Sequence, residues 1–181
     1  MIYILVNMIY NNNMKKYMQL ALIMVLTGCN ITASEEDIMT VNTDLSEYRE
    51  LNKKQTEMFK EIDLDSLQDI ITNHKTAVIY LGYSACDNCQ KAIVKLAILA
   101  EECGATVYYL DALEAFTDDA DSYEKGMELL DPVLEESNAT QGKEIICPEL
   151  ILVQNGEYKD WYIGIDENID ERYREILNVQ K

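Results

Sequence analysis

Histidine, proline, glycine and basic residues are scarce in this sequence, and each shortage excludes a class of protein. Two prolines and seven glycines in 181 residues exclude collagen-like and low-complexity chains. The single histidine, His74, and the lack of a second Cys-x-x-Cys pair leave zinc without a full set of ligands, so we expect no metal and no cofactor. Lysine and arginine total 15 against 33 acidic residues, for a formal net charge of −18. Because such a surface repels phosphate backbones, we expect no nucleic-acid partner.

A long apolar run is also missing from the N-terminal region. Lys15 and Lys16 precede apolar residues 20–26, a run far shorter than the ~20 residues that span a bilayer. A basic start followed by a short apolar run is typical of a signal peptide. The run ends Leu26-Thr-Gly-Cys29, which resembles the bacterial lipobox. The resemblance implies cleavage before Cys29 and transfer of a diacylglycerol to its thiol, whereas an ordinary signal peptide with a chance cysteine is the alternative.

These features predict the organisation of the chain. We expect residues 1–28 to be a signal peptide, with Met14 as the true start because the two lysines follow it directly. Residues 29–44 are polar and without sustained periodicity, so we interpret them as a lipid-anchored tether. Residues 45–181 then form the folded domain. Two or more acyl chains anchor a protein stably, so we expect the domain at the cell membrane, on its extracytoplasmic face.

The spacing of apolar residues alternates between helical and extended patterns along the domain. Residues 76–82 form a continuous apolar run, which is typical of a buried strand. Gly104 is a natural stop for the helix before it, and Asn155-Gly156 is a strong hairpin signal. The patterns predict helices over residues 45–62, 65–73 (capped by Asp65 or Ser66), 87–103 and 169–178, and strands over 76–82, 106–111, 149–154 and 157–165. This order predicts an α/β fold with a mixed central sheet flanked by helices.

An acidic stretch separates the second strand from the third. Residues 111–136 hold ten acidic residues and one lysine, and parts of the stretch are helical in pattern. Asp131-Pro132 fits an N-cap followed by a proline in the first turn. We predict an acidic helical insertion here, which is either a solvated decoration or a surface that recognises a partner.

The sequence Cys86-Asp-Asn-Cys89 lies between a predicted buried strand and the start of a helix. Unpaired N–H groups and the helix dipole favour a thiolate at Cys86. Cys89 follows one helical turn later, where it can attack a mixed disulfide formed on Cys86. We therefore expect Cys86 to be the exposed nucleophile, Cys89 the resolving thiol, and Cys86–Cys89 a redox-active disulfide. A permanent structural disulfide at the same spacing is the alternative.

The strand at 76–82, the Cys86–Cys89 motif, its helix and the segment at 145–157 together resemble the thioredoxin superfamily. The resemblance covers roughly residues 64–178 and implies a thioredoxin-like fold. It makes Pro148 the cis-proline that faces the motif and places Cys147, the residue before it, where the family holds the substrate chain. The approach to the motif at 80–86 also resembles bacteriocin-transport accessory proteins.

The sequence departs from the thioredoxin pattern beside the cysteines. Asp87-Asn88 stands where thioredoxins carry Gly-Pro, and the carboxylate of Asp87 should oppose a thiolate at Cys86. Tyr80 occupies the position of a buried carboxylate, and Ala85 that of a tryptophan. These departures affect the rate and redox direction that the resemblance implies, not the fold.

Two functions follow from these patterns. The first is a membrane-tethered oxidoreductase that acts on the thiols or disulfides of exported proteins and exchanges electrons with a partner in the membrane. The second is a thioredoxin-fold accessory subunit of a bacteriocin-type export system, with little turnover.

Overall fold

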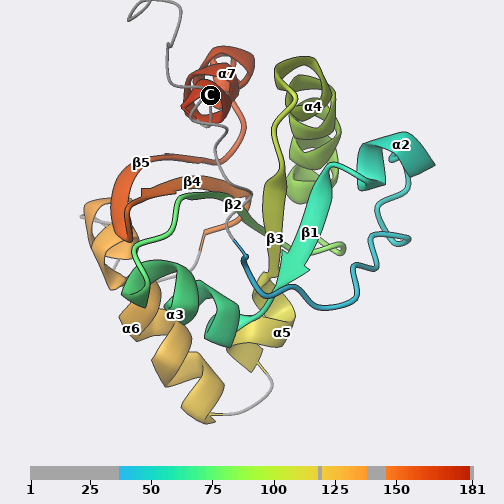
Figure 1. The fold of residues 1–181 in the computed structure, drawn as a ribbon. Coiled ribbons are helices and arrows are strands. Elements are labelled where there is room, and N and C mark those ends of the chain that lie inside the picture. The colour runs from blue at the N-terminus through green and yellow to red at the C-terminus, as the bar shows by residue number, and fades with distance from the viewer. Residues whose placement is uncertain (1–36, 118–119, 138–145, 180–181) are drawn as a thin grey trace, which may run out of the picture. The chain divides into compact units, whose positions relative to one another are not determined.

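A five-stranded mixed sheet organises the chain, whose computed structural model describes residues 37–117, 120–137 and 146–179 (Figure 1). The strand order is β1-β3-β2-β4-β5. The parallel part consists of β1 (Phe59–Ile62), β3 (Val107–Asp111) and β2 (Ala77–Gly82). The antiparallel part adds β4 (Glu149–Gln154) and β5 (Glu157–Ile163). All six residues of β2 are buried, as expected for a central strand.

Helices cover both faces of the sheet. Helices α4 (Asp87–Cys103) and α7 (Ile169–Asn178) pack together on one face, whereas α3 (Leu64–Thr72) and α6 (Ala120–Ser137) lie on the other (Figure 1). Successive side chains of a strand point to opposite faces. Accordingly, Val78 and Tyr80 join the apolar cluster under α4 and α7, while Ile79 and Leu81 join the cluster under α3 and α6. The predicted mixed sheet flanked by helices is confirmed.

Helix α4 begins and ends where the sequence predicts. Cys86 is its N-cap residue, with its side chain accepting a hydrogen bond from the backbone N–H of Cys89. Gly104 ends the helix in the left-handed conformation, with φ of 65°, which glycine adopts without steric cost. The apolar stripe of α4 is buried, including Ile93 and Leu96. The two ends of α4 therefore fix the position of the cysteine motif relative to β2.

The predicted helix over residues 45–62 is wrong. The segment forms turns, a short helix α2 (Lys53–Thr56) and the edge strand β1. Phe59 packs in the cluster on one face of the sheet and Ile62 in the cluster on the other. Apolar residues three apart fit a helix, but they also lie on opposite faces of a strand, and pairing of β1 with β3 decided the outcome.

The acidic stretch is helical as predicted, forming α5 (Ala112–Thr117) and α6. Pro132 lies inside α6 rather than in a first turn, so the predicted helix start at Asp131 is wrong. Leu130, Val133 and Leu134 are fully buried against the sheet on both sides of the proline, and this packing offsets the lost helical hydrogen bond. The inner face of α6 is therefore a layer of the core.

The start of α3 and the turn between β4 and β5 are two further boundaries that local sequence determines. Helix α3 is capped by Asp63, not by Asp65 or Ser66, because the Asp63 side chain accepts a hydrogen bond of 2.8 Å from the backbone N–H of Ser66. The hairpin between β4 and β5 turns at Asn155 and Gly156 as predicted, both with positive φ.

The described part of the predicted tether lies against the domain. Ile38 is buried in the cluster under α3 and α6. The backbone N–H of Val41 donates to the carbonyl of Glu61 over 2.9 Å. Cys29, the predicted signal peptide at 1–28 and residues 29–36 lie outside the described residues. None of the helices that the structure describes has the length and apolarity needed to cross a bilayer.

Candidate redox site

Cys86 ends the loop that leads from β2 into α4. Its Sγ accepts a hydrogen bond of 3.1 Å from the backbone N–H of Cys89, and its own N–H donates to the carbonyl of Tyr83 over 3.2 Å. The side chain is partly exposed, and its neighbours Ala85 and Asp87 are exposed. Cys86 is thus reachable by another protein while its backbone is held in the first turn of α4.

Cys89 lies one turn further along α4 and is fully buried. Beneath it, the fully buried Tyr80 of β2 donates a hydrogen bond from its hydroxyl to the Cys89 carbonyl over 3.0 Å. Where the resemblance would place a carboxylate, this chain has a phenol that fixes the first turn of α4 to the sheet. The relative exposure of the two cysteines is the one that the expected roles require, and the roles themselves stay predictions.

Cys147 and Pro148 approach the motif from the start of β4. The peptide bond between them is cis, as expected, and the Pro148 carbonyl accepts a hydrogen bond of 2.7 Å from Gly164. The Cys86 thiol faces the Cys147 carbonyl, with 4.0 Å between sulfur and oxygen. The Cys147 thiol itself is hydrogen-bonded to the thiol of Cys89. The structure therefore brings together three of the cysteines, which are 61 residues apart at most.

The contacts among these thiols decide which of them ionises. A hydrogen bond from the Cys147 thiol, followed by one from Cys86, lowers the pKa of Cys89 to about 6 despite its burial. Burial, followed by the thiol of Cys89, raises the pKa of Cys86 to about 11. The hydrogen bond to Cys89, together with burial, also raises the pKa of Cys147. The thiol hydrogen bonds around Cys89 therefore favour ionisation of Cys89 over that of Cys86, where the thiolate was expected.

Sequence reasoning missed a buried acid directly after the cis-proline. The side chain of Glu149 is fully buried, and neither carboxyl oxygen has a hydrogen-bond partner among the described residues. Burial raises the pKa of Glu149 to about 8. Its charge would also raise the pKa of Cys147. One signal was present in the sequence: Glu149 is the only charged residue in the run from 145 to 153.

A second missed feature is the bridge made by Gln90, which holds the loop before the motif. Its side-chain amide donates to the carbonyl of Ser84 over 2.7 Å and to that of Glu47 over 3.0 Å. The Ser84 hydroxyl donates in turn to the carboxylate of Glu47. The loop before Cys86 is therefore tied both to α4 and to the segment before α2.

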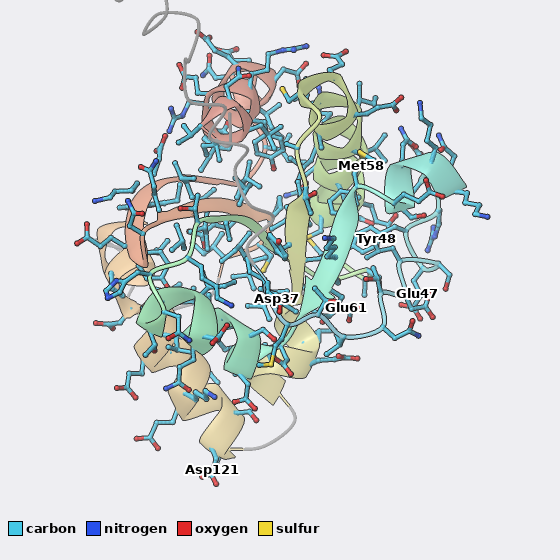
Figure 2. All side chains as sticks on the ribbon, in the orientation of Figure 1. Asp37, Glu47, Tyr48, Met58, Glu61 and Asp121 are labelled. Carbon is cyan, nitrogen blue, oxygen red and sulfur yellow. The ribbon has the colours of Figure 1, made fainter. Side chains whose placement is uncertain are left out.

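An acidic cleft of about 730 Å³ opens beside this loop. Glu61 of β1 lines the cleft together with Glu47 and Tyr48 from the segment before α2, and Figure 2 labels these three side chains. Seven carboxylate side chains line the cleft against one basic residue, Lys125. Ser84, two residues before Cys86, is part of the same lining, so the acidic side chains of the cleft lie beside the loop that leads to the motif.

The fourth cysteine of the described residues lies apart from this cluster. Cys103 is at the opposite end of α4, and Cys29 lies outside the described residues. No group of metal-ligating side chains suited to hold an ion occurs within the ranges 37–117, 120–137 and 146–179.

Comparison with known proteins gives structural neighbours only. No protein-family model matches the sequence, and no curated protein matches it. A thioredoxin from Trypanosoma brucei brucei is 13% identical, covering 66% of this chain and 88% of its own, with a TM-score of 0.43. Mitochondrial thioredoxin 3 from Saccharomyces cerevisiae is 14% identical, and the match covers 68% of this chain and 97% of the yeast chain, with a TM-score of 0.42. Thioredoxin from Aeropyrum pernix is 14% identical, and the match covers 64% of this chain and 84% of the Aeropyrum chain, with a TM-score of 0.38.

The topology of the described residues carries the structural conclusion. Three parallel strands continue into an antiparallel hairpin, helices cover both faces, and a cis-proline begins the strand beside the Cys-x-x-Cys motif. The described domain has a thioredoxin-like α/β fold.

Proposed function

We propose that this chain is a thiol–disulfide oxidoreductase that acts on exported proteins through Cys86 and Cys89. The observation that carries the proposal is the arrangement of the pair: Cys86 is partly exposed at the N-cap of α4, and Cys89 is buried one turn later in hydrogen-bond contact with it. A substrate can therefore reach one sulfur while the other is kept for the second step.

The exchange begins with a proton transfer inside the pair. Cys86 passes its proton to the thiolate of Cys89 along their hydrogen bond. The Cys86 thiolate attacks one sulfur of a substrate disulfide, and the other substrate sulfur leaves with the electron pair and takes up a proton. Cys89 then loses its proton and attacks Cys86, which forms the Cys86–Cys89 disulfide and releases the substrate as a dithiol. The reverse sequence oxidises a substrate dithiol.

Substitution of each cysteine separates the two roles. Cys86→Ser should abolish exchange, whereas Cys89→Ser should accumulate mixed disulfides because the resolving attack is missing. Reduction of a model protein disulfide, with dithiothreitol as electron source, and gel detection of trapped complexes measure both effects. Cys103→Ser is the matched control and should behave as the wild type. Equal trapping by the first two variants would contradict the assigned roles.

We also propose that a lipid on Cys29 holds the domain at the extracytoplasmic face of the cell membrane, where a membrane partner supplies or removes electrons. The support is the lipobox-like sequence that ends at Cys29. Cys29→Ala should block lipidation and move the protein out of the membrane fraction. If this variant remains membrane-bound to the wild-type extent, the proposed anchoring is wrong.

An accessory subunit of a bacteriocin-type export system with little turnover is the second candidate. Partial burial of Cys86 and the resulting raised pKa of its thiol disfavour a reactive thiolate at this position. Turnover of the model disulfide by the purified chain separates the two candidates, because an accessory subunit would show little turnover. An accessory subunit would also bind its partner equally well when Cys86 is replaced by serine.

A further inference from the structure

Cys147 occupies a position that the proposed two-cysteine reaction leaves unused. Its thiol is hydrogen-bonded to that of Cys89, the buried member of the pair. It also contacts the apolar clusters on both faces of the sheet, so it lies at the edge where α4 meets the start of β4. Cys89 therefore has two sulfur neighbours on different elements: Cys86 in its own helix and Cys147 across the cis-proline segment.

We propose that Cys147 is a third redox thiol, which attacks Cys89 in the oxidised protein and moves the disulfide from Cys86–Cys89 to Cys89–Cys147. The inference rests on the proposed function, because it begins from the disulfide that the reaction forms. It assigns Cys147 a reacting role in place of the substrate-holding role that the resemblance implies.

The step is balanced without any external oxidant or reductant. The Cys147 sulfur loses its proton and forms a bond to Cys89 Sγ, and the Cys86–Cys89 bond breaks. The electron pair of that bond goes to Cys86, which takes up one proton, so one disulfide and one thiol become another disulfide and another thiol. Once released, the Cys86 Sγ can accept the backbone N–H of Cys89, a contact of 3.1 Å at the start of α4, before it takes up its proton.

The geometry favours Cys89 as the sulfur attacked. A disulfide requires sulfur atoms about 2.05 Å apart, and the thiols of Cys89 and Cys147 are already in hydrogen-bond contact. Cys86 instead contacts residue 147 through its backbone: the Cys86 thiol faces the Cys147 carbonyl at 4.0 Å. Cys147 therefore meets the buried sulfur directly, while Cys86 meets the backbone.

The oxidised domain would therefore exist in two forms, which carry the same single disulfide between different cysteines. In the Cys86–Cys89 form both sulfurs of the motif are blocked. In the Cys89–Cys147 form the partly exposed Cys86 is a free thiol while the domain remains oxidised. Such a form can attack a wrongly paired disulfide in a substrate and release it again, which is the chemistry of disulfide isomerisation rather than of net reduction.

Tryptic peptides of the full chain distinguish the two disulfides. Cleavage after Lys75 and Lys91 leaves Cys86 and Cys89 in one peptide, 76–91, whereas cleavage after Lys143 and Lys159 places Cys147 in peptide 144–159. Cleavage after Lys95 and Lys125 places Cys103 in a third peptide, 96–125. A Cys86–Cys89 bridge is thus a loop within one peptide, and a Cys89–Cys147 bridge joins two.

The full-length chain is oxidised with glutathione disulfide, alkylated at low pH and digested. In Cys86→Ser, peptides 76–91 and 144–159 should be joined, and the joined species should be lost completely in Cys86→Ser/Cys147→Ala. Cys86→Ser/Cys103→Ser is the matched control and should keep the link. In the wild type, the loop within 76–91 should form first and the joined peptides should follow, with Cys86 alkylated.

Two results would overturn the inference. One is a Cys86→Ser protein that carries only glutathione adducts on Cys89 or Cys147. The other is a wild-type digest that contains only the loop within 76–91 at all times. In either case the wild type can still turn over the model disulfide, so failure of this inference is distinct from failure of the proposed function, in which no disulfide exchange occurs at all.

Discussion

Replacing Glu149 by glutamine should stabilise the protein, and by an amount that grows with pH. The carboxyl is fully buried, has no partner among the described residues, and has its pKa raised by burial from 4.5 to about 8. In the unfolded chain it loses its proton near pH 4.5, whereas in the folded chain it keeps the proton until about pH 8. The free energy of unfolding therefore falls as pH rises from about 4.5, and the loss levels off above about pH 8.

The size of the effect follows from the two pKa values. Each pKa unit corresponds to about 1.4 kcal/mol, so the penalty of Glu149 is about 1 kcal/mol at pH 5, about 3 kcal/mol at pH 7 and about 4 kcal/mol at pH 8. Glutamine is close in size to the protonated carboxyl and does not titrate. Glu149→Gln should therefore raise the free energy of unfolding by about these amounts.

Urea denaturation under reducing conditions at pH 5, 7 and 8 measures the difference. Glu128→Gln is the matched control, because Glu128 is exposed on α6 and its substitution should change stability by less than about 0.5 kcal/mol at every pH. Parallel pH dependence of the wild type and Glu149→Gln would refute the reasoning, since it would mean that Glu149 titrates alike in the folded and unfolded chains.

Three further substitutions test the site and the layers around it. Tyr80→Phe removes the hydroxyl that donates to the Cys89 carbonyl and should cost about 1 kcal/mol in urea denaturation, with Tyr123→Phe on the exposed face of α6 as control. Cys147→Ala removes the hydrogen bond that contributes most to lowering the pKa of Cys89 to about 6. The pKa of Cys89 should therefore rise in a titration of thiolate absorbance, while Cys103→Ala should leave it unchanged. Leu130→Ala should cost about 2–5 kcal/mol if the inner face of α6 is part of the core, and a loss below about 0.5 kcal/mol would make α6 a decoration.

Local signals predicted the elements that carry the site. The run of β2, the cap at Cys86 and the stop at Gly104 all act within one element, so the sequence alone located α4 and the motif at its start. The edge strand β1 was mistaken for a helix because its pairing with β3 joins residues about 48 positions apart, beyond any local pattern. The Asn155-Gly156 turn was predictable because its backbone angles demand those residue types.

The chemistry of the site was harder to predict than its position. The sequence pattern placed Cys86 at a helix N-terminus and so predicted a thiolate there, because the effect of the helix N-terminus acts within the four residues of the motif. The larger effect comes from Cys147, whose thiol reaches Cys89 only after the sheet has formed.

The same folding step also places an unpartnered carboxyl at Glu149, the buried first residue of β4, two residues after Cys147. Deprotonation of that carboxyl above about pH 8 would raise the pKa of Cys147 further. The segment around the cis-proline therefore influences ionisation at the motif through the side chains of Cys147 and Glu149, and this influence depends on tertiary contacts that no local spacing specifies.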